Sequence, residues 1–242
     1  MTKAALIDWF RSGGDPWMGW EEVVEFMQST HPRTIFVKSL PRHGVLLDIG
    51  AGDGSLQVLR QWLKPARLDL RFYAYAMEWA EAFSHYDRYE IGEWPNNKPV
   101  FDGERFDAIL ACHFIEHIPD PVEFLKWAAS RLRRDGRLYI EWPSENSKDQ
   151  PPRDSFRAQG IPIDTSNFYD DLTHKELPTR DSVIRAITTQ NLIIDQSGFI
   201  SNRLAEQEVL AHFKQGLDDK YALQFILWSR TKWAQYVIAS KA

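Results

Sequence analysis

The fold of this chain is indicated by residues 45–56, which read VLLDIGAGDGSL. An apolar run typical of a buried parallel strand breaks here into three alternating glycines. Glycine tolerates positive φ and lets a ligand approach the backbone without a Cβ in the way, so a tight ligand-binding turn should follow the strand. Residues 56–63 then place apolar side chains at helical spacing. The stretch therefore predicts a strand, a glycine turn and a helix whose free N–H groups face the ligand.

The spacing of the glycines separates two cofactor classes. A dinucleotide-binding fingerprint, G-x-G-x-x-G, would need its third glycine where this chain has Ser55. The chain instead has Gly50, Gly52 and Gly54, with Asp48 in front. This pattern resembles the first motif of the class I S-adenosylmethionine (SAM) methyltransferases. A glycine turn without a ligand is the alternative that the motif alone leaves open.

Composition excludes several classes of protein. The 242 residues suffice for one large α/β domain, and 43% apolar and 26% charged residues are values of an ordinary globular protein. A net charge of −5 with scattered basic residues disfavours nucleic acid as a partner. The single cysteine, Cys112, excludes an internal disulfide and favours a reducing, cytoplasmic setting. We expect neither a transmembrane segment nor a signal peptide, because no apolar run is long enough.

Two acidic residues stand where a cofactor would meet the strand ends. Residues 70–77 read as a second strand that ends at Glu78. In doubly wound sheets, ligands bind outside the carboxyl ends of the strands, and an acid beyond the glycine turn accepts hydrogen bonds from ribose hydroxyls. Glu78 fits that role, and the start of a helix is the alternative. Residues 89–94 read as a third strand whose end, near Glu93, would lie beside the adenine.

A second strong signal follows the fourth expected strand, residues 106–112. The strand runs into HFIEHIPDP, residues 113–121, and a helix over 122–132. This resembles the fourth motif region of the methyltransferase group that contains the ubiquinone-biosynthesis enzymes. Residues 133–137 then turn into a fifth strand, 138–143, and are similar to the L-x-P-G-G-x-L element of that family, with Asp135 in place of the first glycine. The resemblance covers about residues 45–143.

The histidines of this segment also match a zinc-peptidase pattern, H-x-x-E-H, as His113, Glu116 and His117. We predict no metal, because a zinc site needs a third ligand and a long helix, whereas Pro119 would end any helix one turn later. His117 is expected to bond a nearby backbone group. His113, at the end of strand four, either faces the substrate near the transferred methyl or has a structural role.

The remaining segments surround this core. Helices are expected over residues 3–12, 19–30 and 32–40, and the first two either form a lid or pack on the sheet. A long loop, 144–178, contains FYDDLTH at 168–174. That run resembles a D-x-T-H loop of bacterial methyltransferases associated with polysaccharide and glycan modification. A helix over 179–190, begun by Thr179, precedes a sixth strand over 192–196.

The last part of the chain reads as helices over 203–215 and 218–231 and a final strand over 235–239. In the family, this last strand is inserted antiparallel beside strand six. The two helices either wall the acceptor pocket or form a homodimer contact, and the sequence leaves both roles open.

The resemblance implies a Rossmann-like doubly wound α/β fold with a seven-stranded sheet, six strands parallel and one antiparallel. It also implies one class I methyltransferase domain over 1–242, with N-terminal helices at 1–43, a SAM-binding core at 44–143 and substrate-side elements at 144–242. The implied cofactor is SAM, and the implied cofactor-binding residues are Asp48, Gly50, Ala51, Gly52, Gly54, Glu78, Trp79, Glu93, Cys112 and His113.

The function predicted on this basis is methyl transfer from SAM to a hydroxyl of a sugar, glycan or other small molecule. Transfer to carbon or nitrogen, or SAM binding without turnover, are the alternatives. Histidine titrates near neutrality, so the candidate bases are His174 and His113. The candidate substrate residues are Trp17, Tyr169, Asp170 and Asp171.

Overall fold

A computed structural model describes residues 2–242, and the chain divides into two compact units. The first, called here the helical unit, comprises the described residues up to Pro32 together with Pro143–His174 and Phe199–Gln235. The second, the sheet unit, comprises Arg33–Trp142, Lys175–Gly198 and Tyr236–Ala242. The assignment of all 242 residues to a single domain stays a prediction.

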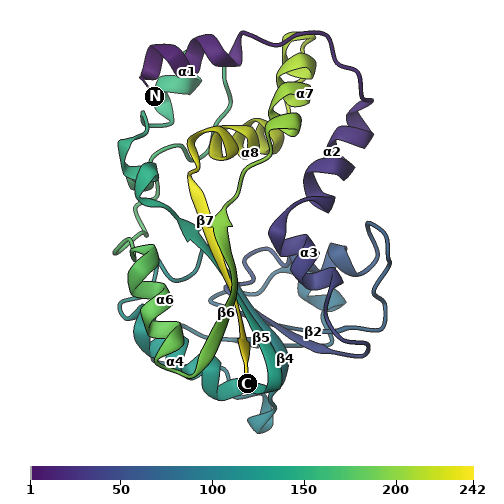
Figure 1. Ribbon diagram of the computed structural model, residues 1–242, viewed down its shortest axis with the longest axis vertical. Helices are drawn as coiled ribbons and strands as arrows, with labels where there is room; N and C mark the ends of the chain where they lie inside the picture. Colours follow the sequence, from purple (N-terminus) through teal and green to yellow (C-terminus); the bar gives the residue numbers. More distant parts are fainter. Residues whose placement is uncertain (1) are drawn as a thin grey trace. The chain divides into compact units, whose positions relative to one another are not determined.

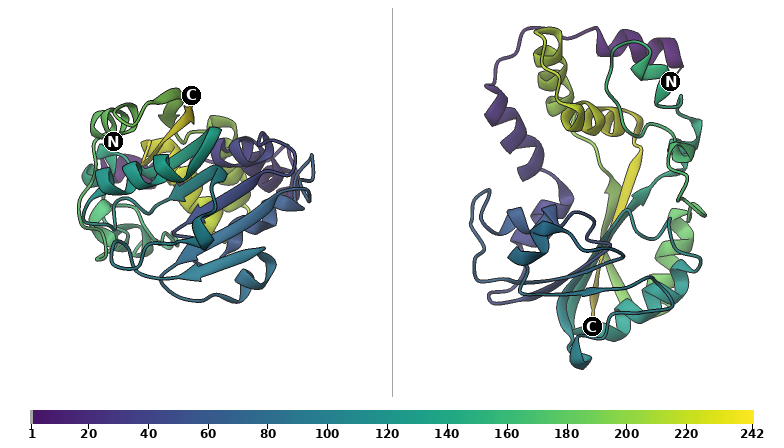
Figure 2. Two further views of the ribbon diagram at one scale, coloured as in Figure 1. Left: turned by 90° about the horizontal axis from the view of Figure 1, so that it is seen from below. Right: turned by 180° about the vertical axis from the view of Figure 1, so that it is seen from behind.

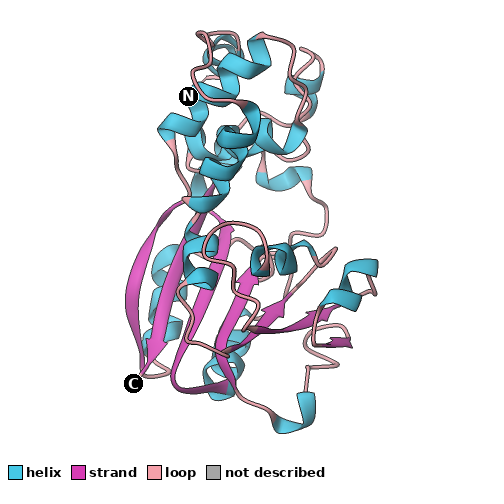
Figure 3. Ribbon diagram, turned by 90° about the vertical axis from the view of Figure 1, so that its right-hand side faces the viewer, coloured by secondary structure: helices cyan, strands magenta, loops and turns pink. Residues whose placement is uncertain are grey.

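The described chain forms a seven-stranded sheet in the order β3-β2-β1-β4-β5-β7-β6 (Figure 3, strands in magenta). Its strands are β1 (Val45–Ile49), β2 (Arg71–Ala76), β3 (Arg88–Ile91), β4 (Phe106–Cys112), β5 (Leu132–Pro143), β6 (Leu192–Phe199) and β7 (Ala234–Lys241). Six strands run parallel and one antiparallel, which confirms the predicted fold class. The order reverses between β1 and β4, and ligands of doubly wound sheets bind at such a switch point.

The middle of the sheet is buried because its strands are almost entirely apolar. All five residues of β1 are buried, and its register places Asp48 opposite Ala74 of β2 and Leu110 of β4. Strands covered on both faces need such continuous apolar runs. Asp48 is therefore an ionisable group in the centre of an apolar layer.

Three helices flank the sheet within the sheet unit: α3 (Pro32–Lys38), α4 (Pro121–Arg131) and α6 (Arg180–Thr188). Helices α4 and α6 pack side by side, as Figure 1 shows. The Thr179 hydroxyl accepts a hydrogen bond from the Ser182 N–H and caps α6, as predicted from the sequence. Asp120 caps α4 in the same way, with Pro121 at its first position.

The helical unit has a separate apolar core. Its helices are α1 (Lys3–Phe10), α2 (Trp20–Ser29), α5 (Asp154–Arg157), α7 (Arg203–Lys214) and α8 (Lys220–Thr231), with the 3₁₀ turns η4 (Glu145–Asp149) and η5 (Phe168–Asp170). Helix α7 packs against both α2 and α8, which can be followed in Figures 1 and 2. Buried residues such as Phe10, Val209 and Leu223 form the core between these helices. No helix among residues 2–242 is long and apolar enough to cross a membrane.

The helix expected over residues 56–63 is wrong in kind, because the structure has only the 3₁₀ turn η1 (Ser55–Arg60). The Lys38 ammonium donates to the carbonyl oxygens of Leu59, Trp62 and Leu63, at 2.6, 2.7 and 3.0 Å. These carbonyls are thereby satisfied without a further helical turn. Leu63 also has φ 66°, which is outside the α-helical region.

The fifth strand begins earlier than expected. β5 starts at Leu132, and the predicted turn over 133–137 lies inside it as an irregularity: Phe106 pairs with Leu132, but Ala108 already pairs with Arg137. Asp135, which replaces a glycine of the family element, has φ 60°. The position thus keeps the left-handed backbone that glycine would supply, and aspartate is among the residues that tolerate it.

Candidate active site

The three glycines that follow β1 all adopt positive φ, of 72° at Gly50, 54° at Gly52 and 78° at Gly54. A Cβ on Gly50 would lie 2.8 Å from the ring of Phe114, and one on Gly54 would lie 2.9 Å from Phe83. Gly52 differs, since it is exposed and a Cβ there would come no closer than 3.9 Å to another atom. The turn is therefore packed at its two ends and open to a ligand in the middle.

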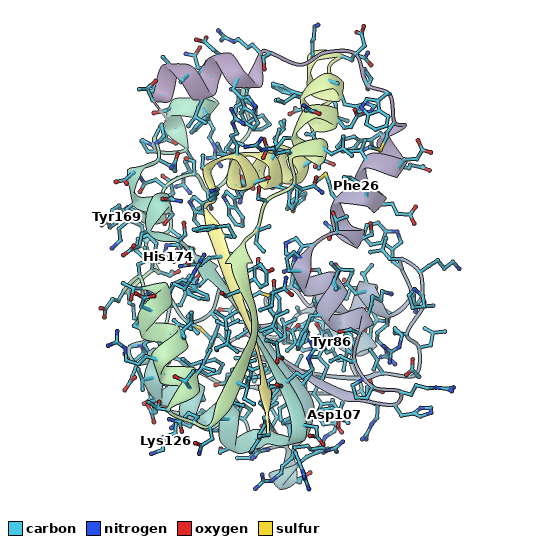
Figure 4. The ribbon with its side chains drawn as sticks, in the orientation of Figure 1. Phe26, Tyr86, Asp107, Lys126, Tyr169 and His174 are labelled. Atoms are coloured by element: carbon cyan, nitrogen blue, oxygen red, sulfur yellow. The ribbon has the colours of Figure 1, made fainter. Side chains whose placement is uncertain are left out.

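Asp48 is held by a residue that the sequence did not single out, Tyr86. The Tyr86 hydroxyl donates to Oδ2 of Asp48 at 2.7 Å, and only 4% of Asp48 is exposed. Burial raises the pKa of Asp48 to about 6, although Tyr86 and Arg33 partly oppose the shift. Tyr86 lies on the sheet unit in Figure 4. Asp48 remains a candidate for orienting the amino group of the cofactor.

The ends of β1, β2 and β3 lie along one edge of the sheet. The N–H of Gly50 donates to the carbonyl of Tyr75 in β2 at 2.9 Å, and the N–H of Gly92 after β3 donates to the carbonyl of Ala76 at the same distance. Glu78 and Glu93, the first acids beyond β2 and β3, are both exposed. Trp79 is 61% exposed, and Ala51 is buried within the glycine turn.

Glu78 has no hydrogen-bond or ion-pair partner among residues 2–242. An exposed carboxylate that the protein itself does not use is available to a ligand, and it is an acceptor only. This matches the predicted role of accepting bonds from ribose hydroxyls. The role stays a proposal.

His113 is enclosed by carboxylates at the end of β4. Its Nδ1 lies 3.1 Å from Oε1 of Glu116, and its Nε2 lies 3.3 Å from Oε1 of Glu141. Burial lowers the pKa of the imidazole, but the two carboxylates outweigh this effect and raise it to about 9. The two carboxylates that face its ring nitrogens therefore favour the imidazolium form, which has no lone pair to accept a proton. This geometry is suited to the structural role, and the role of His113 as a base stays a prediction.

Other polar groups complete this buried cluster. The Tyr139 hydroxyl donates to Oε2 of Glu141 at 2.6 Å, and Sγ of Cys112 lies 4.0 Å from the same oxygen. Burial and then Glu141 raise the pKa of the Cys112 thiol, so it stays neutral. Burial lowers the pKa of Arg33, but Cys112 and Glu141 raise it more. Glu141 was not among the expected site residues, although a glutamate inside the apolar run LYIEW is a detectable signal.

His117 was expected to bond a backbone group. Its main-chain N–H donates to the carbonyl of Phe114 at 3.0 Å, which closes the turn after β4. The side-chain bond stays a prediction.

Among the predicted substrate residues, Asp170 is used by the helical unit itself. Its carboxylate accepts hydrogen bonds from the N–H groups of Arg153, Ser166 and Asn167 at 2.8–3.2 Å. Several N–H donors to one carboxylate leave few lone pairs for a ligand. These bonds tie Asp170 to the loop 151–170, and its substrate role stays a prediction.

The other loop residues divide into anchored and exposed side chains. The His174 ring stacks on Phe168 with centroids 4.4 Å apart, and its Nδ1 lies 2.6 Å from the Phe168 carbonyl oxygen. Asp171 accepts from the N–H and the hydroxyl of Thr173, at 2.8 and 2.6 Å. Tyr169 is 65% exposed, and Figure 4 labels it beside His174 in the helical unit. Trp17, which precedes α2, is 70% exposed.

Comparison with known proteins identifies the family. The pattern of a family described as a methyltransferase domain matches residues 20–192, well over half of the chain, and the chain belongs to this family. It is also similar to a ubiquinone biosynthesis O-methyltransferase of Parvibaculum lavamentivorans. The two are 53% identical over 38 residues, which is 16% of this chain and 15% of that protein.

Solved structures show the same fold. A SAM-dependent methyltransferase from Archaeoglobus fulgidus is 17% identical, with a TM-score of 0.55 over 92% of this chain and 95% of that one. Coclaurine N-methyltransferase, bound to N-methylheliamine and SAH, is 12% identical, with a TM-score of 0.55 over 98% of this chain and 78% of that one. The chain thus belongs to a methyltransferase family and has the fold of solved SAM-dependent methyltransferases.

The sheet unit fits the cofactor. It offers an open glycine at position 52, the exposed carboxylate of Glu78 beyond β2, and the buried carboxylate of Asp48 directly before the glycine turn. Carboxylates accept hydrogen bonds from hydroxyls and from an amino group. A glycine without a Cβ lets a ligand approach the backbone closely.

Proposed function

We propose that this methyltransferase transfers the methyl group of SAM to a hydroxyl of a small molecule or glycan, with a sugar hydroxyl as the preferred acceptor. The observation that carries the proposal is the contact between the His174 ring, in the D-x-T-H loop, and the Phe168 carbonyl. Its Nδ1 lies within hydrogen-bond distance of a backbone carbonyl, which accepts only, so Nδ1 carries the proton. With Nδ1 engaged as the donor, Nε2 is the ring nitrogen that a general base would use.

A base matters for hydroxyl acceptors in particular. When bound, SAM supplies an electrophilic methyl group, and the chain has to hold the acceptor in line, exclude water and receive a proton. Positioning of reacting groups is worth about 7–11 kcal/mol. A well-placed base adds about 10²–10⁴-fold in rate. An alkyl hydroxyl needs this proton acceptor more than a carbon or amine acceptor does.

Two further observations support the proposal. The relative from Parvibaculum lavamentivorans is named an O-methyltransferase. The exposed ring of Tyr169, in the same loop as the anchored His174, is suited to stack on the apolar face of a sugar. Asp171, whose Oδ2 lies 4.0 Å from Nε2 of His174, stays a candidate orienting group.

The test separates a base from a structural anchor by the variant His174→Asn. The asparagine amide retains a donor near the position of Nδ1 and can keep the bond to the Phe168 carbonyl, but it has no basic nitrogen. With SAM and a panel of hydroxyl acceptors that includes oligosaccharides, we expect turnover to fall at least ~10²-fold. Affinity for SAM should remain that of the wild type. Lys175→Ala, an exposed neighbour, is the matched control and should keep full activity.

Each other outcome has a distinct meaning. A near-normal rate for His174→Asn would show that His174 only anchors the loop. Methylated products on carbon or nitrogen, identified by NMR, would contradict hydroxyl transfer. SAM binding without turnover on any acceptor of the panel would indicate a SAM-binding protein rather than an enzyme.

A further inference from the structure

The helical unit contains a partly open cavity of about 520 Å³ that the methyl-transfer site does not explain. Its walls come from α1, the α1–α2 connection, α7 and α8, so it lies entirely within this unit. The volume is within the range of about 300–1,000 Å³ that small-molecule sites occupy. The side chains that line it and carry the argument are Trp9, Trp17, Arg203, Glu206, Gln207 and Arg230.

The backbone around the cavity is firmly placed. A Cβ on Gly13 would lie 2.2 Å from the carbonyl oxygen of Leu210, so the α1–α2 connection lies directly on the backbone of α7. Glu208, which is 1% exposed, accepts hydrogen bonds through Oε2 from the N–H groups of Trp17 and Met18, at 3.1 and 3.0 Å. The buried carboxylate of Glu208 thus fixes the α1–α2 connection that carries Trp17. A preformed wall reduces the entropy lost on binding.

The polar side of the cavity is also organised. Oε1 of Glu206 accepts from the Ser229 hydroxyl at 2.7 Å, and its Oε2 lies 3.8 Å from Nη1 of Arg230. The Arg230 guanidinium in turn lies over the Trp9 ring, 5.6 Å from its centroid. A planar guanidinium carries five N–H donors, so a single carboxylate leaves several of them for a ligand. Gln207, exposed on α7, adds both a donor and an acceptor.

We propose that this cavity binds a saccharide. A sugar ring combines an apolar face with a rim of hydroxyls that both donate and accept. The indole rings of Trp9 and Trp17 suit the face, and Arg203, Gln207 and Arg230 suit the rim.

The carboxylates of the cavity oppose the two other common ligand classes. Glu206, Glu208 and Asp15 would repel a phosphate or nucleotide. A wholly apolar ligand would leave Glu206 and the two arginines buried without solvent, which is costly.

The experiment measures sugar binding to the intact protein without methyl transfer. Methyl β-D-glucopyranoside and methyl β-D-glucopyranosiduronic acid serve as neutral and anionic probes, and saturation-transfer NMR and tryptophan fluorescence report binding. We expect at least one probe to bind at millimolar concentration. Trp17→Ala should weaken binding at least tenfold, because the exposed stacking ring is lost. Tyr221→Ala is the matched control, since Tyr221 is a 76% exposed aromatic of α8 in the same unit but outside the cavity, and it should bind like the wild type.

The proposed saccharide site can fail its test without affecting the proposed methyl transfer. No saturation transfer from either sugar, or equal weakening by Trp17→Ala and Tyr221→Ala, would overturn the cavity as a saccharide site while leaving methyl transfer untouched. Because Trp17 is exposed, its variant is not expected to unfold the protein. Gln207→Ala provides a second test from the polar rim, and unchanged affinity in both cavity variants would also overturn the proposal.

Discussion

At the scale of single residues, the sheet unit has buried carboxylates that bind other side chains and exposed carboxylates that a ligand can reach. Asp48, Glu116 and Glu141 are buried and meet a tyrosine hydroxyl or an imidazolium. Glu78 is exposed and has no such partner among residues 2–242. A buried carboxylate is stable only when it is paired, whereas an exposed one costs nothing to leave open for a ligand. Glu78 is therefore the sharper target for testing cofactor recognition.

We expect Glu78→Ala to weaken SAM binding by about 1.5–3 kcal/mol, the range for a hydrogen bond to a charged group. Isothermal titration calorimetry on the intact protein measures this difference. Glu81→Ala removes an equally exposed carboxylate three residues later in η2 (Glu81–His85) and should leave the affinity unchanged. Equal affinities for the Glu78 variant and the wild type would remove this residue from the site.

At the scale of elements, the turn between β1 and η1 combines a left-handed backbone with an open surface. Gly52 has φ 54° and open space where a Cβ would stand. Gly103, at the end of η3 (Phe101–Gly103), has φ 79° and is equally open. An L-residue in the left-handed region costs about 1–2 kcal/mol irrespective of space. The two glycines thus form a matched pair, of which only Gly52 lies in the candidate cofactor turn.

We expect Gly52→Ala and Gly103→Ala to lower the free energy of unfolding by a similar amount, about 1–2 kcal/mol each. Urea denaturation measures this effect. Only Gly52→Ala should also weaken SAM binding, because its methyl group would occupy the space that the backbone leaves for the cofactor. A Gly52 variant that binds SAM as well as the Gly103 variant does would place the cofactor away from this turn.

At the scale of the whole molecule, the enclosed His113 links stability to pH. Its pKa is raised to about 9 in the folded protein, from an ordinary value of 6.5, by Glu116 and Glu141. A basic group with a raised folded pKa stabilises the protein fully below its unfolded pKa, and this contribution is lost as pH rises through the folded pKa. The window therefore runs from about 6.5 to about 9.

We expect the free energy of unfolding of the wild type to fall across this window, and His113→Gln to reduce that fall. Urea denaturation at a series of pH values from below 6.5 to above 9 gives both slopes. His43→Gln is the control, because His43 lies exposed in the turn before β1. Parallel pH profiles for the wild type and His113→Gln would contradict the assignment of His113 as an imidazolium between two carboxylates.

The local sequence was sufficient to predict most helices and strands, because the patterns that indicate them extend over only a few residues. The apolar runs of β1 and β4, the cap at Thr179 and the helices α7 and α8 were predicted within a few residues of their ends. Two of the differences came from distant partners. Lys38 binds the carbonyls after η1, and the pairing with β4 extends β5 back to Leu132. Neither contact is visible from local periodicity.

The sequence by itself determined the class of fold and the place of the glycine turn, because an apolar strand that ends in alternating glycines has few structural solutions. Only the tertiary structure decided what each polar side chain does. The Asp170 carboxylate accepts hydrogen bonds from three backbone N–H groups, and His113 lies between Glu116 and Glu141. The physical reason is that the charge state and availability of a side chain depend on burial and on partners that are distant along the chain, as with Tyr86, which is 38 residues from Asp48.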